Sequence, residues 1–127
     1  MSYFDLEMPA IAITTEDAQH LSLLALSDTP PAKSLAREIS RANIIPGHQA
    51  LRGLVCMGSL VTYRDDMTCQ LHEVTLVYPH DTEGDPNRVS VLSPVGTALI
   101  GLSVGQVMEF ETPHGDKRSL TVMYVWD

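Results

Sequence analysis

The stretch SVLSPVGTALIGLSVGQVMEF (residues 90–110) is the most strongly patterned part of the chain. It reads as the end of an apolar strand, a Ser-Pro step, a short helix of small residues, a glycine and a second apolar strand. Pro94 at the start of the helix and Gly101 after its end follow the usual asymmetry of helix termini. Ser93 is of the residue type that caps a helix N-terminus. The stretch has no His, no Cys and no charge before Glu109, so it favours folding or docking over catalysis.

Alternating apolar residues predict strands on both sides of this stretch. The segments 54–65 and 68–79 alternate with the two-residue period of half-buried strands. A further short strand is expected at 88–93, and residues 105–127 are expected to form a hairpin with its turn at PHGD (113–116). The C-terminal part of the chain is therefore predicted to be an antiparallel β-domain with one short helix.

The two cysteines lie in the first predicted hairpin. With its turn at RDDM (64–67), Cys56 would face Thr75 and Cys69 would face Thr62. The two sulfur atoms would then lie roughly 20 Å apart at ~3.3 Å per strand residue, which is too far for a disulfide. Both cysteines are expected to be small buried side chains in a reducing compartment.

A helix is predicted after a short apolar strand at 10–14. Thr14 or Thr15 can cap it, and the two acidic residues that follow suit the positive end of the helix dipole. Residues 27–31 (SDTPP) end this helix. Its apolar residues recur at helical spacing and should face the core: Ala18, Leu21, Leu24 and Ala25.

A second helix is predicted to begin near Pro31, because proline suits the first turn of a helix. Its apolar face should carry Leu35, Ile39 and Ala42, and its solvent face Lys33, Arg37 and Arg41. Two helices of about 12 residues joined by a tight turn predict an antiparallel helical hairpin with arms roughly 18–20 Å long.

The 127 residues are enough for one domain, or one domain with an appendage. The spacing of apolar residues changes from the helical to the strand period after 45–53 (IPGHQALRG), so we expect a helical hairpin at 1–47 and a β-domain at 48–127.

The net charge of -8 argues against direct nucleic-acid binding, because phosphate contacts need clustered Lys and Arg. No apolar run approaches the ~20 residues of a membrane span, and the N-terminus lacks the basic region of a secretory signal. A cytoplasmic location is therefore expected.

Reactive side chains do not gather into a recognisable site. The five histidines are scattered, and none pairs with another ligand at a recurring metal-binding spacing. The glycines at 96, 101 and 105 fit neither of the common phosphate-binding loops. Ser93 has no nearby His in the sequence and does not sit in a nucleophile elbow. We therefore expect no catalytic residue, no cofactor and no metal.

The segment VSVLSPVGTALIGLSVGQVMEFETPHG (89–115) resembles the C-terminal signature of Gre-type transcription factors. The whole chain, from about Ile11 to Trp126, is most similar to the Rnk family, named as regulators of nucleoside diphosphate kinase. The features that carry this resemblance are IAIT-x-x-DAQHL (11–21), LVYP (76–79) and SPVGTALIGLSVG (93–105).

The resemblance implies an α+β fold, in which a short antiparallel coiled coil precedes an FKBP-like β-domain of the Gre C-terminal type. It also implies RNA polymerase as the partner. Gre-type proteins dock this domain at the mouth of the polymerase secondary channel and insert the coiled coil, whose acidic tip supports transcript cleavage. Residues around the Ser-Pro step contribute to docking, which points to Leu92, Ser93 and Pro94. Gre factors often have a polar or acidic residue where this chain has Leu92.

The length of the arms and the chemistry of the tip separate this chain from Gre factors. Arms of roughly 18–20 Å are much shorter than Gre arms, and Asp28 is the only carboxylate between Ser27 and Pro31. A magnesium site needs at least two converging carboxylates. The resulting hypothesis is a monomeric, non-enzymatic modulator that binds polymerase through residues 92–94 and Asp28, competes with Gre factors and does not stimulate cleavage.

Three other functions are alternatives to this hypothesis. A Gre-like cleavage factor remains open, and so does a direct or indirect regulator of nucleoside diphosphate kinase, although no phosphate-binding element is present. A peptidyl-prolyl isomerase shares the expected β-domain type. It needs a deep aromatic pocket, and the small number of aromatic residues, with one Trp, two Phe and four Tyr, argues against one.

Overall fold

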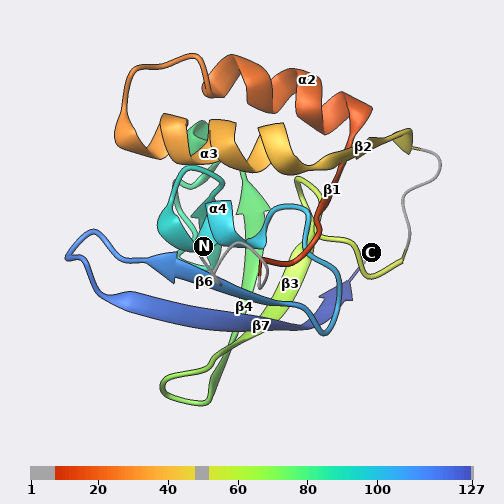
Figure 1. The fold of residues 1–127 in the computed structure, drawn as a ribbon. Coiled ribbons are helices and arrows are strands. Elements are labelled where there is room, and N and C mark those ends of the chain that lie inside the picture. The colour runs from red at the N-terminus through yellow and green to blue at the C-terminus, as the bar shows by residue number, and fades with distance from the viewer. Residues whose placement is uncertain (1–7, 48–51, 127) are drawn as a thin grey trace, which may run out of the picture.

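The computed structural model of the chain describes residues 8–47 and 52–126. It has an α+β fold, in which two N-terminal helices lie side by side over a short third helix and a curled sheet (Figure 1). In chain order the elements are β1 (Ala12–Thr14), α2 (Thr15–Leu24), α3 (Pro30–Arg41), β2 (Asn43–Ile45), β3 (Leu60–Asp65), β4 (Gln70–Val77), the 3-10 helix η2 (Pro79–Asp81), β5 (Arg88–Ser90), α4 (Pro94–Leu99), β6 (Val107–Glu111) and β7 (Lys117–Trp126).

Both N-terminal helices begin at a threonine cap. The Thr14 hydroxyl accepts a hydrogen bond from the Asp17 amide at 3.2 Å, so Thr14 rather than Thr15 starts α2. The Thr29 hydroxyl accepts from the Ala32 amide at 3.3 Å and starts α3, with proline in its first turn. Leu21 of α2 and Leu35 of α3 are completely buried, which confirms the predicted apolar faces.

The strands form a five-stranded sheet in the order β5-β4-β3-β7-β6, and β1 pairs separately with β2. Three of the four strand pairs in the larger sheet are antiparallel, but β4 and β5 run parallel. The expectation of a fully antiparallel β-domain is therefore wrong at this edge. Parallel neighbours need a crossover connection, and residues 78–87, including η2, supply it.

The predicted register of the first hairpin is also wrong. Thr62 faces Glu73, and Asp65 faces Gln70, so the turn occupies residues 66–69 and not 64–67. The Asp65 carboxylate fixes the turn at this shifted position by accepting from two turn amides, those of Met67 at 2.9 Å and Thr68 at 3.4 Å.

The shifted turn changes the surroundings of both cysteines. Cys69 closes the turn in the left-handed region, with φ of 62°, and its side chain is exposed. Cys56 lies before β3 begins, is half-buried and does not face Thr75. The expectation that both are buried strand residues is therefore wrong.

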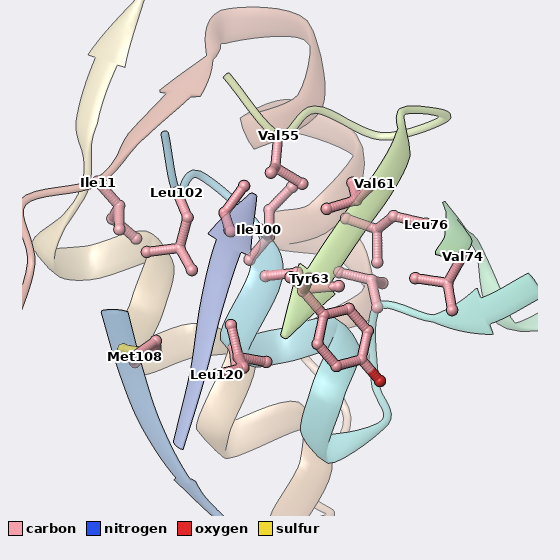
Figure 2. Close-up of a cluster of buried hydrophobic side chains, with 14 of the residues drawn as sticks. Ile11, Val55, Val61, Tyr63, Val74, Leu76, Ile100, Leu102, Met108 and Leu120 are labelled. Carbon is pink, nitrogen blue, oxygen red and sulfur yellow. The ribbon is translucent and has the colours of Figure 1, made fainter. Parts of the chain in front are cut away.

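The core contains side chains from the helices and from the sheet (Figure 2). Leu21 and Leu35 belong to the same buried cluster as residues of β3, β4 and β7. In β6, Met108 is buried and Phe110 packs against the core, whereas Val107 is 47% exposed. The predicted boundary between residues 47 and 48 falls at the edge of 48–51, outside the described residues, and stays a prediction.

Within residues 8–47 and 52–126, every helix is too short or too polar to cross a lipid bilayer.

Candidate functional site

The Ser-Pro step forms a tight corner between β5 and α4. The Ser93 hydroxyl accepts a hydrogen bond from the Gly96 amide at 3.0 Å and donates one to the Ser90 carbonyl at 2.6 Å. The Ser93 amide donates to the same carbonyl at 2.9 Å, and the Leu92 amide donates to the Ser90 hydroxyl at 3.0 Å. The predicted capping role of Ser93 is confirmed, and the backbone of residues 90–96 is held by its own hydrogen bonds.

Gly96 allows α4 to pack directly on the preceding strand. A Cβ atom at this position would lie 1.9 Å from the Ser90 carbonyl oxygen, so no other residue fits without a backbone shift. Next to it, the Thr97 hydroxyl donates to the Val91 carbonyl at 2.6 Å in the buried interior. The corner is therefore a rigid platform that presents Leu92 and Pro94.

Leu92 and Pro94 line a groove of about 520 Å³. One wall is the first half of α3, and the other is β6 together with the turn after it. Its apolar lining includes Met8, Pro30, Leu92, Pro94, Met108 and Phe110. Arg37 lies on the helix side, and Glu109 and Glu111 lie on the strand side. The groove combines an apolar surface with charges of both signs along its walls.

A partly buried ion pair within α3 contacts the segment before β1 and the strand β6. Glu38 is only 7% exposed, and its carboxylate accepts from Arg41 at 2.8 Å. Arg41 also donates to the Pro9 carbonyl at 2.6 Å and lies beside the sulfur of Met108. The expectation that Arg41 faces solvent is therefore wrong, because its guanidinium satisfies a carboxylate and a main-chain carbonyl at once.

Asp28 lies in the turn between the two helices and is exposed. Its carboxylate pairs with Lys33 at 3.1 Å, and both side chains are open to solvent. Asp28 does not line the groove, but Pro30 and Pro31, which follow it in the chain, do. The structure thus brings the start of α3 to the Ser-Pro corner, although it does not bring Asp28 into the same site. Among the residues that the structure describes, no three His, Cys, Asp or Glu side chains gather to hold a metal.

The comparisons with known proteins identify the family. The family described as "Transcription elongation factor, GreA/GreB, C-term" matches residues 50–127. The "Regulator of nucleoside diphosphate kinase" of Escherichia coli (strain K12) is 33% identical over 119 residues, which cover 91% of this chain and 88% of that protein. This chain belongs to the Rnk family. The resemblance noted in the sequence is thereby confirmed.

Other relatives of this Rnk family member are Gre transcription elongation factors. The "Transcription elongation factor GreA" of Prosthecochloris aestuarii (strain DSM 271 / SK 413) is 33% identical over 84 residues, covering 65% of this chain and 52% of that protein. A solved structure, "Prokaryotic transcription elongation factor GreA/GreB from Nitrosomonas europaea", superposes with a TM-score of 0.75 at 31% identity, covering 94% of this chain and 99% of that one. The α+β fold described above is shared with that structure.

Residues 92–94 lie inside the segment that matches the GreA/GreB family, whereas Asp28 lies outside it. The α3 wall of the groove, including Pro30 and Arg37, also lies outside the matched segment. Sequence reasoning missed this wall, because the contact between α3 and the corner depends on how the two parts of the chain pack together.

Proposed function

We propose that this protein regulates transcription by binding RNA polymerase at the entrance of the secondary channel, where it competes with Gre factors without stimulating transcript cleavage. Its membership of the Rnk family and its GreA/GreB-type C-terminal domain support a role in transcription. The partner is a protein surface, and the protein acts as a monomer and not as an enzyme.

The observation that carries this proposal is the position of Leu92 and Pro94 on the wall of the groove. Both side chains are half-buried, and the corner that holds them is fixed by the hydrogen bonds of Ser93 and by the close packing of Gly96. A rigid apolar edge beside a groove loses little conformational entropy on binding, which makes it a good docking element. The acidic net charge of -8 favours a protein partner over nucleic acid.

The absence of cleavage follows from the length of the helices and the chemistry at their tip. With 10 residues in α2 and 12 in α3, the helices are about 15 and 18 Å long at 1.5 Å per residue. We propose that they correspond to a shortened form of the Gre coiled coil, placed on an FKBP-like domain. The single tip carboxylate, Asp28, is paired with Lys33 and does not provide a magnesium site.

The name of the Escherichia coli relative refers to nucleoside diphosphate kinase. We propose that any effect of this protein on that enzyme is indirect and acts through gene expression, because the sequence has no phosphate-binding loop of the common types.

Two assays with purified core RNA polymerase test the proposal. Immobilised polymerase should retain the protein, and backtracked elongation complexes should show no added transcript cleavage when the protein is supplied. GreA serves as the positive control for cleavage in the same complexes. Failure to bind polymerase would refute the proposed partner, whereas cleavage that is lost in Asp28→Ala would refute the argument from arm length.

A further inference from the structure

The inward-facing positions of the sheet continue beyond the end of the hydrophobic core. Tyr63 of β3 and Leu120 of β7 are buried core residues, and the next residues on the same face are Asp65 and Arg118. Phe110 of β6 lies directly opposite Arg118. Charged residues thus occupy inward positions where apolar residues would close the core.

A hollow of about 150 Å³ remains at this end of the core. Its apolar walls are Tyr63, Val95, Phe110 and Leu120, and its polar groups come from Asp65, Thr112, Arg118 and Ser119. Helix α4 has only six residues, so it contributes Val95 near its start and no further cover. Figure 2 shows the Tyr63 side chain extending away from Val61, with its hydroxyl at the far end.

Arg118 leaves one buried donor without an acceptor at this hollow. One terminal guanidinium nitrogen pairs with the Asp65 carboxylate, whereas the Nε–H is buried and has no hydrogen-bond partner among the described residues. Buried polar groups in folded proteins nearly always have a hydrogen-bond partner, so a buried donor without one needs an explanation. Burial first, and the nearby Asp65 charge second, raise the pKa of Tyr63 against an opposing effect of the Arg118 charge.

A neutral acceptor attached to an apolar group would match both this donor and the apolar walls of the hollow. Asp65 already neutralises the Arg118 charge and would repel a second anion, so a carbonyl oxygen suits the site better than a carboxylate. A cavity of about 150 Å³ with apolar walls is large enough for a benzene-sized group. Phe110 and Thr112 also line the larger groove, so a chain that leaves the hollow meets a second apolar surface.

We propose that this hollow binds one apolar side chain of a peptide segment, whose neighbouring main-chain carbonyl accepts a hydrogen bond from Arg118 Nε–H. The site is separate from residues 92–94 and does not depend on polymerase being the partner. Its apolar walls select the side chain, and the guanidinium orients the main chain.

Nuclear magnetic resonance titration of the full chain tests this site, with N-acetyl-leucinamide as the probe. The probe should shift the Val95 and Leu120 methyl signals together with the Arg118 Nε–H signal. N-acetylglycinamide, which lacks the side chain, should produce no comparable shift. N-acetyl-leucine, which carries a carboxylate, should bind more weakly than the amide.

Two variants separate the proposed contact from general effects on folding. Arg118→Lys keeps the charge beside Asp65 but removes the Nε–H, and should weaken binding of the amide about tenfold. Arg88→Lys, at an exposed position away from the hollow, is the matched control and should bind as the unaltered protein does. Val95→Phe should fill the hollow and abolish the shifts.

Three results would overturn the proposal: no shift with N-acetyl-leucinamide at tens of millimolar, equal shifts with the glycine probe, or full binding by Arg118→Lys. Stronger binding of N-acetyl-leucine would assign the hollow to small anions instead of peptide.

Discussion

The Ser93 hydroxyl and the Gly96 amide are joined by a hydrogen bond of 3.0 Å across the first turn of α4. The same hydroxyl donates to the Ser90 carbonyl oxygen, which is also the atom that a Cβ at Gly96 would clash with. One carbonyl group thus takes part in the helix cap and requires a glycine at position 96. This relationship explains why an apparently unreactive stretch is so strongly patterned: its residues build the corner that presents Leu92 and Pro94.

Gly96→Ala is expected to destabilise the protein strongly. The added methyl group would lie 1.9 Å from the Ser90 carbonyl oxygen, so the helix or the strand must move. Overpacking of this kind costs about 1–3 kcal/mol, and a backbone clash falls at or above the upper end. Urea unfolding measures the loss. Gly47→Ala, where the nearest atom is 3.9 Å away, is the control and should change the free energy of unfolding by less than about 0.5 kcal/mol.

Leu92→Ala is expected to weaken binding to RNA polymerase about tenfold or more. The side chain is half-buried at the groove, and apolar anchors of this type dominate protein interfaces. Leu71→Ala is the matched control, because Leu71 is 58% exposed on β4 and does not line the groove. If the two variants bind equally well, and circular dichroism shows that both are folded, Leu92 does not contribute to the interface.

Arg41→Met is expected to lower the free energy of unfolding by about 1–3 kcal/mol, because it leaves the buried Glu38 carboxylate without its hydrogen-bond partner. Lys33→Met breaks the exposed pair with Asp28 and should cost less than about 1 kcal/mol. Thermal or urea unfolding of the two variants distinguishes these outcomes. Similar small losses for both would show that the Arg41 pair does not anchor α3.

Asp66 is expected to make the stability of the protein depend on pH in the acid range. Burial raises its pKa, but hydrogen bonds from Ser119, Arg64 and Thr121 lower it by more, so the folded-state pKa lies below 3.8. The stabilisation is therefore complete at neutral pH and is lost as the pH falls from about 5 through the folded-state pKa.

Urea unfolding between pH 7 and pH 3 checks this expectation. Asp66→Asn should be less stable than the unaltered protein at pH 7 and should lose less stability on acidification. Asp28→Asn, at a carboxylate whose side chain is 91% exposed, should change stability at pH 7 by less than about 0.5 kcal/mol. A parallel loss of stability in the unaltered protein and Asp66→Asn would contradict the role given to Asp66.

Local signals in the sequence predicted the helices and the corner correctly. Thr14 and Ser93 cap the helices as their residue types indicate, and the apolar spacing of Leu21 and Leu35 identifies the buried faces. These features depend on residues a few positions apart, so the linear pattern contains them.

Features that depend on distant residues, or on an unusual local backbone conformation, could not be predicted in the same way. The hairpin register was wrong because Cys69 adopts a left-handed conformation that its residue type does not favour. The helical spacing alone indicates a solvent-facing Arg41, because its partner carbonyl, at Pro9, lies 32 positions earlier in the chain. The α3 wall of the groove arises only when the helices pack on the domain.

The most direct test of the central claim is a competition experiment on core RNA polymerase. Fluorescently labelled protein is bound to the polymerase, and unlabelled GreA is added while the fluorescence anisotropy is recorded. The account predicts that GreA displaces the protein completely and that Leu92→Ala is displaced at lower GreA concentration than Leu71→Ala. Binding that persists at saturating GreA would contradict the claim that the two proteins share one docking site.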